Sequence, residues 1–392
     1  MKGCIVWICW KDIRHPAAGG AELVLQELSM RLVRDGWEVV HLVPGFKGCA
    51  PTEVIDGIRI VRLGRSIFSF YRLPFHFWRH WRRKAAFLGD AFICVGSFAS
   101  LTMGKDRSAI IVYHIEDTKW FHQTTFYGVP RWLMPLIDGC GYFVERMQLM
   151  LLARLHRGAV LTISDSTSGE LQRLGFARDR IRLVNVGTST RALESLAASL
   201  PKERAFTVLM IGPRKGKRPL HTLQAFELFQ KKHPEAQFWV AGWGTEEAAL
   251  RRHVEQHGIR NVTFWGRVPE ARRNELLQRA EVLCTSPLRE GWGLVVTEAN
   301  AMGTPVIGYD VPGLRDALAF QNGWLCACTP EKMAERLEEV HRLWSAEPAA
   351  YEALRRRCLD SAREFTFDRS YRQFTDVLAE RGLAPAASCS GS

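Results

Sequence analysis

The order of apolar runs and amphipathic segments predicts two successive α/β halves. In the first half, residues 21–34 carry apolar side chains at positions 21, 24, 25, 28 and 32, a spacing that gives a helix one buried face. Gly36 then ends that helix. The expected strands of this half are the N-terminal run 1–10, Val39–Val43, Ile58–Leu63, Ala91–Val95, Ile110–His114, Ala159–Ile163 and Arg182–Val186.

The second half alternates more regularly. Its expected strands are Phe206–Ile211, Gln237–Ala241, Val262–Trp265, Val282–Thr285 and Val306–Tyr309. The helices expected between them lie at Leu220–Lys232, Glu246–His257, Arg272–Arg279 and Leu294–Met302, and 331–343, 349–364 and 368–381 follow. Alternating strands and helices predict parallel sheets that bind ligands at the carboxyl ends of their strands.

Composition agrees with two soluble domains of ordinary size. The chain has 392 residues, 47% of them apolar and 24% charged. Its ten cysteines include no C-x2-C pair, which favours free thiols in a reducing cytosol, and Cys326 and Cys328 are spaced as in a strand. The N-terminal apolar run is too short for a signal peptide, and no run reaches the ~20 residues of a membrane span.

The net charge of +12 is concentrated in one segment. Residues 57–89 contain no acidic residue, and aromatic side chains are interleaved with the cations Arg59, Arg62, Arg65, Arg72, Arg79, Arg82, Arg83 and Lys84. Three interpretations stay open: a core helix with a basic solvated face, a site for an anionic membrane surface along 59–84, and nucleic-acid binding. No nucleic-acid motif accompanies the segment, so no nucleic-acid partner is expected.

The most informative segment is 286–309. Glu290 and Glu298 stand eight positions apart, and the glycines after Glu290 predict a loop before the helix 294–302, which Gly303 ends. An open helix N-terminus favours phosphate, and the glycines let backbone approach a ligand closely. A carboxylate repels phosphate, so Glu290 is expected to face sugar hydroxyls or a developing positive charge, and Glu298 a ribose diol. The pattern points to a sugar joined to a nucleoside through a diphosphate.

This segment, Glu290-Gly291-Trp292-Gly293-Leu294 with Glu298 after it, resembles the E-x7-E segment of the retaining glycosyltransferases of family four. The resemblance covers nearly everything except the tail. It implies the α/β GT-B fold, two Rossmann-like domains facing a central cleft. The expected parts are an acceptor-binding domain at 1–187, a linker at 188–203, a nucleotide-sugar-binding domain at 204–366, a helix at 367–383 that crosses back to the first domain, and a disordered tail at 384–392.

Two further loops carry candidate chemistry. Arg214, Lys215, Lys217 and Arg218 follow the first strand of the second half, and cations in a turn before a helix suit a diphosphate. This loop resembles the family's Gly-Arg-x-Lys pattern, but Pro213 stands where the family usually has its arginine. Lys217 is therefore the secure match, and Arg214 a displaced partner. Gly19 and Gly20, in a Gly-Gly-Ala-Glu string, resemble the family's loop near the donor phosphates and the acceptor.

The resemblance assigns the remaining site residues. His114, at a strand end, is expected to reach the transferred sugar, with His122 as runner-up, and Glu290 and Lys217 complete the expected catalytic set. The nucleoside is expected near Gly242, Gly244 and Val268. The full donor-binding prediction is Gly19, Gly20, Arg214, Lys217, Gly242, Gly244, Val268, Glu290, Gly291, Trp292, Gly293, Leu294 and Glu298.

No Asp-x-Asp triplet occurs in the chain, so the leaving group is expected to be neutralised by protein cations and helix ends, with no metal and no cofactor. The expected function is retaining transfer of a hexose to a hydroxyl of a saccharide, lipid-linked or small-molecule acceptor. The expected location is the cytoplasm, with peripheral binding to the inner face of the membrane as a further hypothesis. The alternatives are a soluble natural product or polysaccharide as acceptor, a sugar-nucleotide epimerase or phosphorylase of this fold, and a non-catalytic membrane-surface adaptor.

Overall fold

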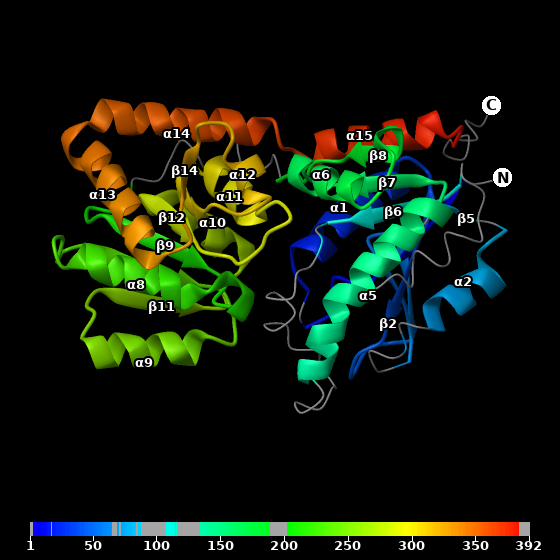
Figure 1. Cartoon of the computed structure of the whole chain (residues 1–392), viewed down its shortest axis with the longest axis horizontal. Helices are drawn as coiled ribbons and strands as arrows, with labels where there is room; N and C mark the ends of the chain where they lie inside the picture. Colours follow the sequence, from blue (N-terminus) through cyan, green and yellow to red (C-terminus); the bar gives the residue numbers. More distant parts are fainter. Residues whose placement is uncertain are drawn as a thin grey trace. The chain divides into compact units, whose positions relative to one another are not determined.

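The chain divides into two compact units, Met1–Val186 with Phe367–Ser392, and Gly187–Thr366. Figure 1 shows this computed structural model. It describes residues 3–16, 18–64, 69, 72–83, 85–87, 107–113, 115, 134–188 and 202–383. The expected strand Ala91–Val95 and the expected tail 384–392 lie outside these ranges, as do most of the expected linker, His114 and His122.

The first unit is built on parallel strands. One sheet has the order β3-β4-β2-β1-β5, in which only the pair β3–β4 is antiparallel, and a second has the order β6-β7-β8. Its strands are β1 Cys4–Ile8, β2 Glu38–Pro44, β3 Thr52–Ile55, β4 Ile58–Leu63, β5 Ala85–Phe87, β6 Ala109–Val112, β7 Ala159–Thr162 and β8 Ile181–Leu183. Its α-helices are α1 Gly20–Arg34, α2 Leu73–His80, α5 Met134–Leu155, α6 Asp165–Arg173 and α15 Phe367–Glu380.

Burial follows the sequence pattern of this unit. All five residues of β1 are buried, as expected for a central strand of a parallel sheet. The last helix, α15, packs on α1, where Arg31 bonds Asp368 at 2.8 Å. Leu73 and Phe77 of α2 belong to a hydrophobic core that also contains Val6 of β1 and Leu42 of β2. The basic aromatic segment therefore contributes an amphipathic helix whose apolar side is part of the core.

The second unit is a doubly wound sheet. Its order β11-β10-β9-β12-β13-β14 is parallel throughout and corresponds to 3-2-1-4-5-6 in chain order, the Rossmann arrangement. The strands are β9 Thr207–Ile211, β10 Gln237–Ala241, β11 Val262–Gly266, β12 Val282–Thr285, β13 Val306–Tyr309 and β14 Gly323–Cys326. The α-helices are α8 Pro219–Gln230, α9 Glu247–His257, α10 Glu270–Arg279, α11 Leu294–Ala301, α12 Leu314–Ala317, α13 Pro330–Ala346 and α14 Pro348–Arg363.

This arrangement confirms the five strands expected in the second half and the alternation with helices. It adds the short α12 and the strand β14, which the spacing of Cys326 and Cys328 indicates only in part, because Cys326 lies in β14 and Cys328 lies after it. In a doubly wound sheet the strand order reverses between the first and fourth strands, here β9 and β12. Ligands bind outside the carboxyl ends of the strands at such a switch point.

Candidate active site

The carboxyl edge of the second sheet brings most of the predicted donor residues together. Arg214 and Lys217 lie in the loop after β9, Gly242 and Gly244 after β10, Val268 after β11, and Glu290 to Gly293 after β12. The loops after β9 and β12 flank the switch point and are bonded to each other, because the Leu288 amide donates to the Gly216 carbonyl at 3.1 Å. Residues far apart in the sequence thus share one edge of one unit.

Lys217 and Glu290 meet at the centre of this edge. The Lys217 ammonium donates to Oε2 of Glu290, and the two side chains are only 22% and 20% exposed. A cation that suits a phosphate and a carboxylate that suits sugar hydroxyls therefore occupy one spot. The spacing of the sequence suggests each group separately, whereas their direct contact across 73 positions is a finding of the structure.

The N-terminus of α11 is open to an anion. Its N-cap is Gly293, whose φ of 88° is in the left-handed region, and no side chain caps the helix among the described residues. The first turn, Leu294 to Val296, contains no carboxylate. A Cβ at Gly293 would lie 2.6 Å from Cδ2 of Leu314, so both the backbone angle and the packing require glycine. A helix N-terminus with no side-chain cap and no carboxylate in its first turn is the arrangement that binds phosphate.

Arg218, to which the sequence analysis gives no separate role, holds these loops in place. It has φ 44° and donates to the carbonyls of Ser286 at 3.1 Å and Pro287 at 2.9 Å. Its guanidinium also lies 4.9 Å from the ring centre of Tyr309. Arg218 therefore fastens the β9 loop to the β12 loop, while its neighbour Lys217 reaches Glu290. Its side chain binds protein carbonyls, which distinguishes it from the other cations of this turn.

The nucleoside-side residues are also placed by backbone contacts. The Glu246 amide donates to the Pro213 carbonyl at 3.0 Å, and a Cβ at Gly244 would lie 2.0 Å from that same oxygen. Gly242 has φ 91°, and its amide donates to the Gly266 carbonyl at 2.8 Å. The glycines thus allow the loops after β9, β10 and β11 to touch. Val268 is half-buried in the last of these loops, and Arg214 is exposed.

Glu298 lies one turn inside α11 and is paired with Arg273 of α10, whose Nη2 is 3.0 Å from Glu298 Oε1. Burial raises the pKa of the Glu298 carboxyl, and the charge of Arg273 works against that rise. Nε of Arg273 is buried without a hydrogen-bond partner. The pair is the kind of polar contact that a ribose hydroxyl could complete, because a carboxylate accepts more than one hydrogen bond.

In the first unit, the predicted residues Gly19 and Gly20 begin α1. The Gly19 amide donates to Oε2 of Glu22 at 2.7 Å, and Glu22 also lies 3.5 Å from the Lys11 ammonium. Glu22 therefore caps its own helix, a capping-box interaction that satisfies an N-terminal amide. The open N-terminus found at α11 is not reproduced here, although both helices follow a central strand of a parallel sheet.

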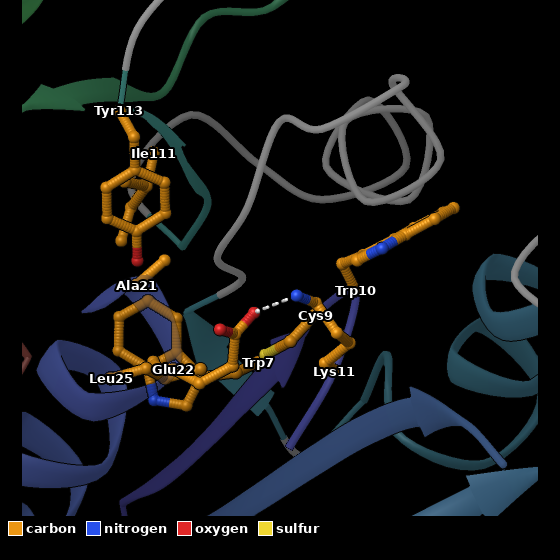
Figure 2. Close-up of a pocket in the computed structure, with 9 residues that line it drawn as sticks. All are labelled: Trp7, Cys9, Trp10, Lys11, Ala21, Glu22, Leu25, Ile111 and Tyr113. Atoms are coloured by element: carbon orange, nitrogen blue, oxygen red, sulfur yellow. Dashed lines mark ion pairs between the residues drawn. The ribbon is translucent and has the colours of Figure 1, made fainter. Parts of the chain in front are cut away.

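A small hollow lies beside this turn (Figure 2). Its lining residues come from β1 and the segment after it, from the start of α1, and from the end of β6: Trp7, Cys9, Trp10, Lys11, Ala21, Glu22, Leu25, Ile111 and Tyr113. Figure 2 shows the Tyr113 hydroxyl pointing toward α1, while the indole of Trp10 extends away from the Lys11–Glu22 pair. The aromatic rings and the ion pair make a polar–aromatic hollow at the carboxyl edge of this sheet.

The basic aromatic segment is partly exposed and partly buried. Phe75 and Trp78 of α2 are 68% and 45% exposed, and the Arg82 guanidinium lies 4.5 Å from the Trp78 ring centre. Arg62, one of the eight cations of this segment, is buried and bonded to Asp12 at 2.7 Å. Arg65 and Lys84 lie outside the described residues. Among the helices of the described ranges, none combines the length and the apolar character needed to cross a bilayer.

Comparison with known proteins connects both units to one family. The model of "Glycosyltransferase Family 4" matches residues 18–192, and that of "Glycosyl transferases group 1" matches residues 193–364. Glycogen synthase of Mycobacterium tuberculosis is 25% identical over 97% of this chain and 94% of its own length. Phosphatidyl-myo-inositol mannosyltransferase of Mycolicibacterium smegmatis is 30% identical over 38% of this chain and 39% of its own.

The fold agrees with solved structures along nearly the whole chain. HepE of Anabaena, in complex with UDP and glucose, has a TM-score of 0.71 and 12% identity, and the match covers 96% of this chain and 100% of that one. The fold class expected from the sequence, GT-B with two Rossmann-like domains, is confirmed. The roles of the individual site residues stay predictions.

Proposed function

Because this chain belongs to family four of the glycosyltransferases, we propose that it moves a sugar from a nucleotide-diphosphate sugar to an acceptor hydroxyl with retention of configuration. The observation that carries this proposal is the meeting of Lys217 and Glu290 between β9 and β12, beside the uncapped N-terminus of α11. One edge of one sheet then offers a cation and open amides for a diphosphate, and a carboxylate for the sugar attached to it.

Each of these residues is proposed to contact a different part of the donor. The bond between the anomeric carbon and the diphosphate oxygen breaks as an oxocarbenium-like state forms. Lys217, Arg214 and the amides of 291–294 stabilise the charge on the departing diphosphate. Glu290 orients the sugar hydroxyls, and Glu298 accepts from the ribose. These protein groups supply the neutralisation that paired carboxylates and a metal supply in other enzymes, so the reaction is proposed to be metal-independent.

The acceptor oxygen attacks the same face of the sugar that the diphosphate leaves. Its proton passes to the departing phosphate oxygen, so that the new bond between carbon and oxygen forms on the retained face. Gly19 and Gly20 shape the β1–α1 turn of the first unit, and the hollow lined by Trp10, Lys11 and Tyr113 is proposed to receive part of the acceptor. His114 is the proposed contact of the first unit with the transferred sugar.

Donor binding tests this proposal. The full chain is heated with a panel of UDP-, GDP-, ADP- and TDP-sugars, and at least one is expected to raise its melting temperature. A ligand at 100 times its Kd adds ~2.7 kcal/mol of stability. UDP-sugars are the first choice because HepE of Anabaena is solved with UDP and glucose. If none of the panel stabilises the chain, the proposed donor site is wrong, and NMR analysis of product anomers separately tests retention.

A lipid-linked saccharide is the proposed acceptor, at an anionic membrane surface. The exposed side of α2 supports this, because Phe75 and Trp78 stand among the exposed cations Arg72, Arg79, Arg82 and Arg83. Each cation near an anionic surface contributes ~1 kcal/mol, and aromatic rings insert at the headgroup level. Myo-inositol lipid is the acceptor named for the mannosyltransferase of Mycolicibacterium smegmatis, a relative of this chain.

Vesicle sedimentation tests the surface. Binding to phosphatidylcholine vesicles containing phosphatidylglycerol is expected, with little binding to phosphatidylcholine alone. Replacing Phe75 and Trp78 together by Ala is expected to weaken binding about 10-fold, since both side chains bury apolar area in the interface. Phe320→Ala is the matched control, because Phe320 is 43% exposed but lies in the second unit. Equal loss in both variants would exclude α2 as the membrane contact.

A further inference from the structure

Three potential metal ligands converge between α8 and α9, away from the strand-end loops. Glu227 lies in the second half of α8, and His253 and His257 lie in the second half of α9, which is in contact with α8. Nε2 of His253 is 3.0 Å from Oε2 of Glu227, and Nδ1 of His257 is 3.1 Å from Oε1 of the same carboxylate. The two imidazole rings stack with centres 3.9 Å apart.

The spacing of the two histidines on α9 places both of them next to Glu227. Residues four apart lie above one another on one helix face, so His253 and His257 present adjacent nitrogens to α8. The ligand atoms of the three side chains all lie within 4.8 Å of one another. Two imidazoles and one carboxylate are a donor set for Zn²⁺, with bonds of about 2.0–2.2 Å and a fourth position for water. We propose that Glu227, His253 and His257 form a binding site for Zn²⁺ or a similar divalent transition metal.

One ligand of the proposed site is exposed to solvent, and the other two are mostly buried. His257 is 45% exposed, whereas His253 and Glu227 are 12% and 22% exposed. A metal can therefore enter beside His257 and replace the two hydrogen bonds to Glu227. Because both histidines already point to one carboxylate, the ligands need only small side-chain rotations, and little conformational entropy is lost on binding.

A second cluster in the same unit, His233, Glu235 and His341, is less suited to a metal. His233 is bonded to Glu338 at 2.9 Å, and Lys232 lies 3.3 Å from that carboxylate, so a cation already neutralises it. Glu235 is exposed. The first cluster is distinguished by two histidines that share one carboxylate.

The position of the proposed site indicates that a bound metal affects the stability of the second unit and not the transfer reaction. Glu227 is eight residues after Pro219, about 12 Å along the axis of α8, so the site is remote from the loop of Lys217. The helices α8 and α9 directly follow the loops that carry Lys217 and Gly244. A metal that bridges them fixes the two helices together without contacting the donor residues. It therefore stabilises the second unit and has no part in the proposed transfer.

Titration of the full chain with Zn²⁺, followed by calorimetry, tests this site. The unaltered chain is expected to bind Zn²⁺ and to melt at a higher temperature with it. The double variant His253→Gln/His257→Gln is expected to lose affinity by about 100-fold or more, since even losing an outer-shell partner costs 10–100-fold. Glu227→Gln is expected to weaken binding as well. Both variants are first checked by circular dichroism for native helix content.

The matched control is His76→Gln/His80→Gln. These histidines have the same spacing on α2, with ring centres 4.5 Å apart, but no third ligand joins them within the described ranges. Unchanged Zn²⁺ affinity in this control, with loss in the α9 double variant, supports the site. Equal affinity in folded α9 variants, or a sulfur-to-cobalt charge-transfer band when Co²⁺ replaces Zn²⁺, would overturn it, because the metal would then be held elsewhere or by cysteine.

Discussion

In each unit a lysine from the segment after the first strand pairs with a glutamate, and the two pairs differ in where that glutamate lies. Lys11 pairs with Glu22 after β1, and Lys217 pairs with Glu290 between β9 and β12, with both lysine side chains 22% exposed. In the first unit the glutamate caps α1 through the Gly19 amide. In the second, Glu290 leaves the N-terminus of α11 uncapped.

This difference explains why the E-x7-E segment is strong evidence for a phosphate-binding helix N-terminus, whereas the Gly-Gly-Ala-Glu string is weak evidence for one. A carboxylate that bonds the first amides of a helix occupies the place of a phosphate and repels it. A carboxylate placed ahead of the helix, and neutralised by a lysine from another loop, leaves the amides open. We therefore expect the main diphosphate contacts in the second unit, with the first unit contributing turn geometry and acceptor contacts.

The largest effect is expected for Glu290→Gln. The amide keeps the shape of the side chain but removes the charge that pairs with Lys217 and that we propose orients the sugar, so turnover should fall by ~100-fold or more. Glu339→Gln is the control, because Glu339 is also ion-paired, to Arg336 at 2.7 Å, but lies on α13. Near-normal turnover for Glu290→Gln in a steady-state assay would contradict the assignment.

A smaller effect, on donor affinity, is expected from replacing the glycine at the start of α11. Gly293→Ala forces a Cβ into the left-handed region and against Leu314, which costs ~1–2 kcal/mol for the backbone alone and should weaken donor binding about 10-fold. Gly19 has φ −142°, which any residue adopts, so Gly19→Ala should change donor affinity little. Calorimetry with the donor compares the two. If Gly19→Ala weakens donor binding as much as Gly293→Ala does, the contrast between the helices fails.

The smallest effect concerns pH. In the proposed site a ribose hydroxyl donates to the ionised form of Glu298, so we expect donor affinity to be present above the pKa of that carboxyl and to be lost as pH falls through it. Burial raises this pKa and Arg273 lowers it. Arg273→Met should therefore move the acid limb of kcat/KM for the donor to higher pH, and Glu298→Gln should abolish that limb. An unmoved limb in Arg273→Met would remove Glu298 from the ribose site.

Local patterns predicted much of this structure. The helix 294–301 and its left-handed residue at Gly303 follow from apolar spacing and glycine placement within one short segment. The five expected strands of the second unit follow for the same reason, because buried parallel strands are short continuous apolar runs. The expectation of free thiols agrees with the structure at Cys49, Cys284, Cys326, Cys328 and Cys358.

What the sequence did not predict depends on long-range contacts. The Lys217–Glu290 pair, the bonds from Arg218 to Ser286 and Pro287, and the Arg273–Glu298 pair each join distant segments. Arg62 is a further example. It belongs to a basic segment of the sequence, but its pairing with the distant Asp12 accompanies its burial. Residue types at strand ends indicate a ligand, but only the folded chain shows which of them touch.

The most direct test of the account is the affinity for UDP of three proteins: the unaltered chain, Lys217→Met and Lys11→Met. Both variants remove a lysine of equal exposure from an ion pair with glutamate. The account predicts that Lys217→Met weakens UDP binding by ~10-fold or more, the loss of about 1.4 kcal/mol, while Lys11→Met leaves it within about 3-fold. Equal losses, or a larger loss for Lys11→Met, would contradict a diphosphate site between β9 and β12.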